Sequence, residues 1–562
     1  ARLFLSYDLA AERQHVGSAQ SEFLLFRLLS FANQESFTIY GDYTPMFETP
    51  FVRTELEADA GLWSNDNGIS EASVKVYGGK PGLIGYIWSS VEDDRGFRET
   101  NGNSRYRNTW ATVKYEQTVK DSWVGVMIVY DTDAGDASNL SDWDYESASQ
   151  RSESSDGRLF EAGYVHRFSP QATFLAYGKN ESYDGRSYLD DFVYEEFLYG
   201  IPVTLDGTVK NQIKSNMTSI NLQQQLVLGQ HTMLAGTDLY QADSKDIWEY
   251  RAQAYILGIP LGDVANEVEN RPDQSSIRFY LLDYWKPLPT TIFEVGLSYS
   301  TIEAPRKNFP DAIEKDLWGT RIGLNWQPSD DDVFRLSFQR YLNTNVAFQT
   351  TLEPSDVAGF QTWLNAAFGT TVLEEGVAWE RQWNDATFTV FRLSANQLDT
   401  PQYGRVFLGT DRYTESLDRY KASLDINHIL SPSIGLWGNL SDKRWEPDHY
   451  TVLLMPDKDF SELDAALRLK FLNEKGISFS LTGTAVSQHF YSALDQYGNP
   501  RDDENFILMD AGIAYEFPGK KGGIELSIKN IFDRHFSYEL EPVAQETIFP
   551  ARRILLRLLF NF

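Results

Sequence analysis

Histidine, the side chain that most often exchanges protons near neutral pH, occurs seven times in the sequence. None of the seven lies in a zinc-binding HExxH pattern. A GxSxG nucleophile elbow, a phosphate-binding loop and a dinucleotide fingerprint are also missing from any suitable context. The chain has no cysteine, which excludes a disulfide framework, a thiolate metal site and a cysteine nucleophile. We therefore expect a protein that is not an enzyme.

The densest group of candidate metal ligands is a run of carboxylates at Asp131, Asp133 and Asp136. Oxygen-only clusters of this kind suit Ca²⁺. The glycine and the distal glutamate of an EF-hand loop are not in register here, and a solvated acidic loop is the alternative interpretation. The expectation is a protein without a cofactor, in which these three aspartates are the one candidate for a structural calcium site.

An excess of acidic residues narrows the classes of partner. The 562 residues include 80 Asp and Glu against 50 Lys and Arg, a formal charge of −30. Affinity for nucleic acid comes largely from Lys and Arg that neutralise phosphates, so no nucleic-acid partner is expected. No uninterrupted apolar run approaches the roughly 18 residues of a membrane-spanning helix. The sequence does not exclude a membrane β-barrel, because the strands of such a barrel need only about 10 alternating residues.

Segments of about 10 residues with alternating apolar and polar side chains occur in pairs along the chain. A very short turn joins the two members of a pair, and long polar connections separate the pairs. The expected tight turns are Pro81-Gly82, Lys120-Asp121-Ser122, Ser169-Pro170, Gly229-Gln230, Lys286-Pro287-Leu288-Pro289, Ser329-Asp330-Asp331, Asn384-Asp385, Ser431-Pro432-Ser433, Asn473-Glu474-Lys475-Gly476 and Pro518–Gly523. The expected long connections are Asp131–Gly157, Ser182–Ser215, Asp243–Ser275, Asn343–Val372 and Arg444–Ser461.

Short turns at one end and long loops at the other are typical of outer-membrane β-barrels. About ten hairpins, a closing strand at Arg552–Phe562 and an opening strand within Phe37–Leu62 bring the count to about 22. A soluble β-sandwich would show the same alternation. Aromatic residues near strand ends, such as Trp110, Trp123 and Trp326, instead indicate interfacial girdles. We predict an all-β fold: a transmembrane antiparallel β-barrel of about 22 strands in the bacterial outer membrane, with short periplasmic turns and long extracellular loops.

The polar side of the predicted strands would face the lumen of such a barrel. Charged residues on that side would line a wide interior, in which substitutions tune selectivity. A barrel of about 22 strands is wide enough to need a plug. Hydration of the lumen and pairing across strands are the alternative roles for each charge. The lumen-lining candidates are Glu294, Arg321, Arg335, Glu380, Arg392, Glu516, Glu525 and Lys529.

The C-terminal part of the chain resembles a known family. The final strand ends on Phe562 with apolar residues at alternate positions, and it looks like the C-terminal signal that the outer-membrane barrel assembly machinery recognises. Just upstream, the segment Ile528–Phe536 contains Asn530, Phe532 and Asp533. This segment is similar to the N-[LI]-F-D-[KR]-x-[YF] motif in the penultimate strand of TonB-dependent receptors. The resemblance implies a 22-stranded barrel, in which these four residues have a structural role.

The resemblance covers the barrel and not what precedes it. Receptors of this family place a plug domain ahead of the first strand, and no plug motif is recognisable in residues 1–50. We expect a leader segment at residues 1–50, acting in the lumen or the periplasm, and a barrel at residues 51–562. A separate plug or a periplasmic repeat domain is then an expected partner. An inner-membrane complex would supply energy, because the chain has no nucleotide site.

Three functions fit these observations, and outer-membrane lipid is an expected partner in all of them. The first is uptake of a ligand too large for porins by a transport barrel of the TonB-dependent-receptor type. The second is export or assembly of a polysaccharide or protein, fed by a periplasmic helical-repeat region. The third is surface binding or a structural role. The strand number and the motif at Asn530, Phe532 and Asp533 favour the first.

Overall fold

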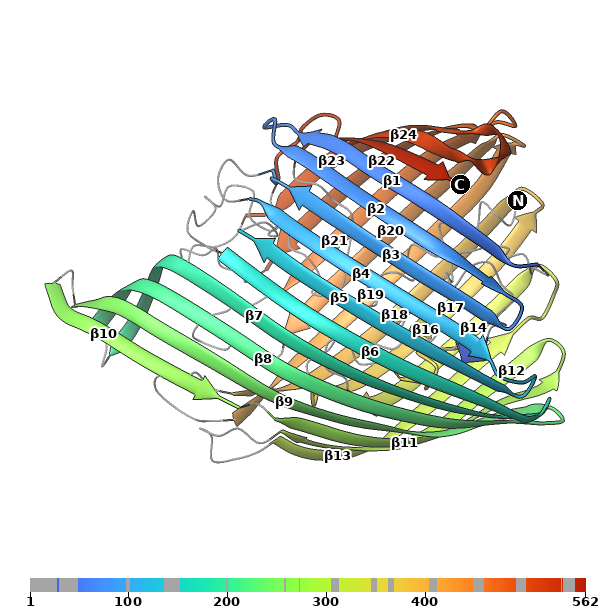
Figure 1. Cartoon of the computed structure of the whole chain (residues 1–562), viewed down its shortest axis with the longest axis horizontal. Helices are drawn as coiled ribbons and strands as arrows, with labels where there is room; N and C mark the ends of the chain where they lie inside the picture. Colours follow the sequence, from blue (N-terminus) through green and yellow to red (C-terminus); the bar gives the residue numbers. More distant parts are fainter. Residues whose placement is uncertain are drawn as a thin grey trace.

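The structure is a computed structural model of the 562-residue chain. It describes residues 28–29, 49–97, 102–135, 152–198, 201–256, 259–271, 273–304, 313–344, 351–361, 368–403, 412–447, 459–491, 502–536, 538 and 551–562. Strands make up nearly all of these residues (Figure 1). No helix in this part of the chain is long and apolar enough to cross a membrane.

Most of the strands follow one another as antiparallel hairpins, and a short 3₁₀ turn, η1 (Pro518–Lys520), links β23 to β24. The strands are β1 (Phe51–Trp63), β2 (Gly68–Lys80), β3 (Leu83–Asp94), β4 (Ser104–Glu116), β5 (Asp121–Ala134), β6 (Ser152–Ser169), β7 (Ala172–Leu198), β8 (Ile201–Leu228), β9 (His231–Ile256), β10 (Ile259–Asn270), β11 (Gln274–Leu288), β12 (Thr291–Ala304), β13 (Ile313–Trp326), β14 (Asp332–Leu342), β15 (Asp356–Val357), β16 (Phe360–Gln361), β17 (Thr371–Asn384), β18 (Thr387–Tyr403), β19 (Arg412–Ser431), β20 (Ile434–Pro447), β21 (Phe460–Leu472), β22 (Ile477–Phe490), β23 (Glu504–Glu516), β24 (Gly522–Lys529) and β25 (Arg553–Asn561).

The large sheet closes on itself. It contains 23 strands, of which β10 is an extra strand paired with β9, so that 22 strands form the ring. The first strand, β1, pairs with the last, β25, from Glu55 opposite Asn561 to Trp63 opposite Arg553. Beyond this register, the backbones of Thr54 and Phe562 exchange hydrogen bonds of 3.1 and 2.8 Å. The predicted all-β barrel of about 22 antiparallel strands is therefore confirmed.

All ten tight turns expected from the sequence join consecutive strands of this ring. They lie at one end of the barrel, together with the first residue of β1 and the last residue of β25 (Figure 1). We call this the short-turn end. The longer connections gather at the opposite, long-loop end.

Two of the five expected long connections are wrong. We expected loops at Ser182–Ser215 and Asp243–Ser275, but β7, β8, β9 and β10 continue as paired strands through most of these residues. The prediction from the sequence places the end of each strand where the alternation of apolar and polar side chains stops. A ladder of backbone hydrogen bonds needs no apolar face once it leaves the lipid, so polar strands extend beyond the rim of the other strands (Figure 1).

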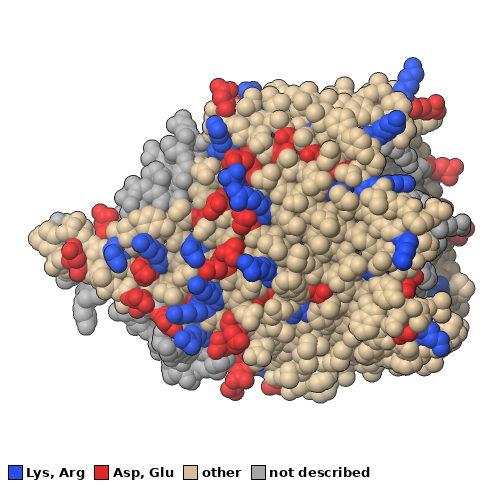
Figure 2. Space-filling view, viewed as in Figure 1, with Lys and Arg blue, Asp and Glu red and all other residues tan. Residues whose placement is uncertain are grey.

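Side chains alternate between the outer face and the lumen. On β12, Val295 and Leu297 are 57% and 47% exposed on the outside, whereas Glu294 and Ser298 face inward and are 3% and 7% exposed. Figure 2 shows a broad area of the outer face with few charged side chains and a band of charges toward the long-loop end. An apolar outer face and a polar interior are what a barrel in lipid requires.

The family-motif residues form the turn that ends β24. Asn530 and Asp533 both adopt left-handed backbone angles, with φ of 48° and 54°. The amide of Asn530 makes two hydrogen bonds to the backbone of Arg534, of 2.8 and 2.9 Å. The carboxylate of Asp533 accepts a hydrogen bond of 2.8 Å from the backbone of Arg552, next to β25. Phe532 is exposed. This geometry ties the end of β24 to the start of the closing strand.

An ion pair crosses the seam between β1 and β25. The Arg557 guanidinium lies 2.9 Å from a carboxylate oxygen of Asp59 and 2.9 Å from one of Glu57. The Asp59 residue is buried, and Arg557 is partly exposed. A buried carboxylate that loses its cation is strongly destabilising, so this contact adds to the hydrogen bonds that close the barrel.

Replacing Arg557 by alanine should lower the free energy of unfolding by about 1–3 kcal/mol, less than for a fully buried pair because the arginine is partly exposed. The measurement is the temperature at which the folded barrel loses its compact migration on a gel. Adding Asp59→Asn should recover part of the loss, because the uncompensated charge is then gone. Equal transition temperatures for all three proteins would contradict a role for this pair at the seam.

Candidate functional site

A segment of the connection between β14 and β17 folds back into the barrel. Residues 351–361, which we call the infolded segment, contain the two-stranded sheet of β15 and β16. They contact inward-facing residues of β8, β9, β11, β12 and β13. This segment and the wall that it contacts are the candidate functional site.

Polar side chains of the inner wall bind the backbone of the infolded segment. Gln223 of β8 donates a hydrogen bond of 2.7 Å to the carbonyl of Leu352. Arg321 of β13 donates one of 2.7 Å to the carbonyl of Pro354. These wall side chains supply the partners that a buried backbone requires away from a sheet.

A chain of buried charges joins the infolded segment to the wall. Glu294 of β12 pairs with Arg321, and Glu353 of the infolded segment lies 3.8 Å from Arg321 and 2.8 Å from Arg278 of β11. The backbone N–H of Ala358 donates a hydrogen bond of 3.2 Å to Glu294. All four charged side chains have little exposure. Charges buried in this way are stable only when each has a partner, so Glu353 is a specific anchor of the segment.

Glycines in the wall make room for the infolded segment. A Cβ at Gly323 of β13 would lie 3.1 Å from Val357 and 3.2 Å from Ala358. A Cβ at Gly376 of β17 would overlap the ring of Phe360. Glycine inside a strand often marks the close approach of another chain segment, and both glycines have that role here.

The infolded segment reaches far toward the short-turn end. Its contacts Glu294 and Arg335 are each the fourth residue of their strands, β12 and β14, counted from that end. At about 3.3 Å per residue, they lie roughly 10 Å along the strand from the turns. A cavity of about 30 Å³ remains between the wall and the segment, lined by residues that include Asp238, Arg278 and Glu353. The segment therefore packs closely on this side of the lumen.

The lumen-lining candidates are placed mostly in ion pairs. Besides Glu294 with Arg321, Arg335 pairs with Glu380 at 2.6 Å and Lys529 with Asp510 at 3.1 Å. Pairing across strands, the alternative role, therefore describes at least five of the eight candidates, and contact with a ligand stays a prediction for each. The remaining three are Arg392, which is half-buried on β18, and Glu516 and Glu525, which are exposed.

The candidate calcium ligands differ in their surroundings. Asp131 lies 3.4 Å from the guanidinium of Arg107, and Asp133 is exposed. Asp136 lies outside the described residues. Among the residues that the structure does describe, no group of three His, Cys, Asp or Glu side chains is placed to hold a metal ion. The calcium site stays a prediction.

Reasoning from the sequence missed the residues that hold the infolded segment. Glu353 lies within the connection Asn343–Val372, where no alternation pattern exists to assign it a side of a strand. Arg278 was not singled out because charged residues on several strands share its pattern. The usable signal was glycine in a strand interior at positions such as Gly376, because such glycines mark close approach.

No family model and no curated protein matches the sequence. Solved structures match its fold at low sequence identity. The ferric citrate transporter FecA in its unliganded form has a TM-score of 0.67 and 13% identity, over 95% of this chain and 82% of that one. The copper transporter OprC has a TM-score of 0.66 and 11% identity, over 92% of this chain and 84% of that one. BauA, the ferric preacinetobactin receptor from Acinetobacter baumannii, has a TM-score of 0.66 and 10% identity, over 92% and 80%.

The chain has the barrel fold of TonB-dependent receptors. The resemblance inferred from the C-terminal motif is thus confirmed at the level of fold. In a TonB-dependent-receptor barrel, a ring of 22 strands encloses a lumen wide enough to need an internal obstruction. Here the infolded segment occupies part of that lumen.

Replacing Glu353 by alanine should release the infolded segment in a larger fraction of molecules. Arg278 would keep a buried charge without its closest carboxylate, at a cost of roughly 3–5 kcal/mol. We expect a higher single-channel conductance in planar bilayers. Asp356→Asn is the matched control, because it also removes one negative charge from the infolded segment. The Asp356 carboxylate accepts a hydrogen bond of 3.1 Å from Gly359, which lies within the same segment. Equal conductance for the two variants would contradict the anchor.

Replacing Gly376 by leucine should displace the ring of Phe360 from the wall, because the new side chain would occupy the same space. We expect faster proteolysis within residues 351–361 when protease is added to the purified barrel. The same change at Gly483 of β22, where a Cβ meets nothing within 4 Å, should leave the rate unchanged. Equal cleavage in both variants would show that the glycine does not seat the segment.

Proposed function

We propose that this protein spans the bacterial outer membrane and takes up a ligand too large for porins. One observation carries the proposal: a ring of 22 strands encloses a chain segment that is held to the inner wall by buried ion pairs. Wide barrels of this size serve transporters with an obstructed lumen, whereas open channels are built from about 16–18 strands. An obstruction held by specific contacts suits regulated passage of a captured ligand.

The solved structures of similar fold suggest the class of ligand to test first. Their names describe a ferric citrate transporter, a copper transporter and a ferric preacinetobactin receptor. We propose a metal ion or metal chelate as the ligand class. The polar lumen with its mixed charges would give such a hydrophilic ligand a path across the lipid.

The proposed partners follow from the same model of transport. Energy would come from an inner-membrane complex, because no nucleotide-binding motif is recognisable in the sequence. A separate plug or a periplasmic repeat domain would complete the gate. The barrel assembly machinery would recognise the closing strand and Phe562, and outer-membrane lipid would surround the apolar outer face.

The test is uptake by cells with and without the protein. The panel consists of ferric citrate, a ferric catecholate, ferric preacinetobactin and copper, with a large neutral oligosaccharide as a probe of passive leakage. We expect the protein to raise accumulation of at least one metal species several-fold, and a protonophore to abolish the increase. Accumulation of the oligosaccharide alone, unaffected by the protonophore, would show a passive pore and overturn the proposal. No difference for any compound would also overturn it for this ligand class.

Surface binding is a second candidate, favoured by the strands that project beyond the rim. The strands β7, β8 and β9 have 27, 28 and 26 residues, against 8 to 20 for the other strands of the ring. Aromatic rings lie on this projection: Trp248 and Tyr250 stack with centroids 6.1 Å apart, and the Lys210 ammonium lies 5.6 Å from the ring of Tyr188. Removing β10 should abolish ligand capture on this hypothesis and leave lumen conductance unchanged.

A further inference from the structure

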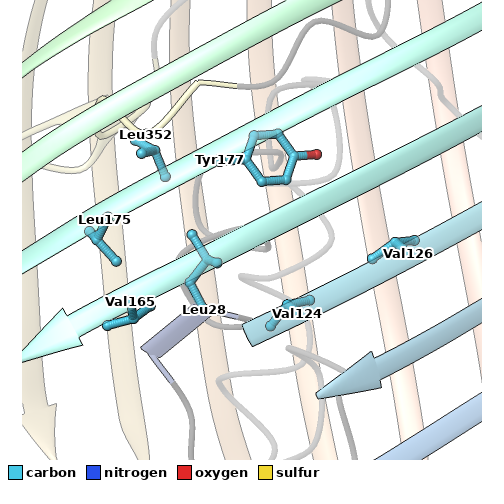
Figure 3. Packing of buried hydrophobic residues seen from close by; sticks show 7 residues of the cluster. All are labelled: Leu28, Val124, Val126, Val165, Leu175, Tyr177 and Leu352. Atoms are coloured by element: carbon cyan, nitrogen blue, oxygen red, sulfur yellow. The ribbon is translucent and has the colours of Figure 1, made fainter. Parts of the chain in front are cut away.

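An apolar patch lies on the inner wall at β5, β6 and β7. The patch consists of Val124 and Val126 of β5, Val165 of β6, and Leu175 and Tyr177 of β7, and all five are buried. Most lumen-facing residues nearby are polar or charged, as expected for an aqueous interior. An apolar patch that faces a wet lumen needs a cover to remove it from water. Figure 3 shows the patch and the two leucines that cover it.

The two leucines come from parts of the chain that are far apart in sequence. Leu28 precedes the barrel, and Leu352 belongs to the infolded segment. Both are fully buried, at 0% exposure, and both belong to the same cluster as the wall residues. The patch is therefore the place where the leader segment and the infolded segment meet.

The wall is shaped and charged to receive the backbone at Leu28. Gly163 of β6 faces the lumen, and a Cβ at this position would overlap the Leu28 side chain. The ammonium of Lys114, which is fully buried, donates a hydrogen bond of 3.0 Å to the carbonyl of Leu28. Arg167 donates one of 3.2 Å to the carbonyl of Leu29. Two cations and a glycine thus form a specific seat, beyond the apolar contact.

We propose that Leu28 and its seat form an intrachain latch, in which docking of Leu28 on the patch helps to hold the infolded segment against the wall. This inference rests on the proposed function only in assuming that release of the infolded segment opens a path for a ligand. The seat itself is independent of what the barrel transports. When Leu28 leaves, the apolar patch that Leu352 also covers is partly exposed to water, and Lys114 loses an acceptor. The infolded segment keeps the contacts of Glu353, of Thr351 and of its backbone, but it then lies on a patch that is partly open to water.

Cysteine cross-linking tests the seat. The chain has no cysteine of its own, so a pair introduced by Leu28→Cys and Gly163→Cys is unique. In the membrane-inserted 562-residue chain under mild oxidation, we expect most molecules to form an intrachain cross-link. The matched control pairs Leu28→Cys with Gly512→Cys, another lumen-facing glycine, on the distant strand β23. Equal cross-linking in both pairs, or none in the first, would overturn the proposed seat.

Conductance tests the latch. We expect Leu28→Asp to raise single-channel conductance several-fold over Leu28→Met, because an aspartate cannot remain in the apolar patch and a methionine can. Reduction of the Leu28→Cys/Gly163→Cys cross-link should likewise raise the conductance of that protein. If the cross-link forms but its reduction leaves the conductance unchanged, Leu28 occupies its seat, and the proposed effect of Leu28 on the infolded segment is wrong. Failure of the uptake experiment with both of these results positive would overturn the ligand class and leave the latch intact.

Discussion

Closure of the sheet at β1 and β25 is the constraint on which the rest of the structure depends. Lipid offers no partner to an unpaired N–H or C=O group, so a sheet that crosses a membrane must leave no edge. The ladder from Glu55 to Trp63 against β25 satisfies this requirement, and the pair of Arg557 with Asp59 supports it from the lumen side. A ring of 22 strands then encloses a lumen too wide to be filled by wall side chains alone. The infolded segment and the wall residues that hold it fill part of this lumen.

Charge and space at the wall explain how the lumen is occupied. Buried cations such as Arg278 and Arg321 require carboxylates close by, and the infolded segment brings Glu353 between them. Glycines at the wall allow the segment and the leader to approach where any side chain would interfere. Polar contacts select the position of each element, whereas the apolar patch around Leu28 and Leu352 removes hydrocarbon from water. The two kinds of contact lie on neighbouring strands, which places Leu28 and the infolded segment in one packed unit.

Much of the fold could be predicted from the sequence, because the barrel is specified by local signals. Two-residue periodicity assigns faces, and short turns such as Pro81-Gly82 mark one end. The strand extensions in β7 to β10 could not be predicted in the same way, since strands outside lipid need no apolar face. The candidate site was harder to predict from the sequence, for a different reason. Arg321 and Glu294 have strand alternation and were identified, but Glu353, which lies 3.8 Å from Arg321, is in a long connection, and only the fold brings it within reach. Leu28 offered no signal at all, because its seat is made of residues from β4, β5, β6 and β7.

We infer that this chain obstructs its own barrel. The most direct measurement is the single-channel conductance of the unmodified 562-residue protein in planar bilayers, with insertion verified by heat-modifiable migration of the recovered protein. The account predicts a folded barrel with a small or intermittent conductance, because the infolded segment and the leader residues at Leu28 occupy the lumen. A large and steady conductance from every inserted molecule would contradict it, since a freely open ring of this width would then be the resting state.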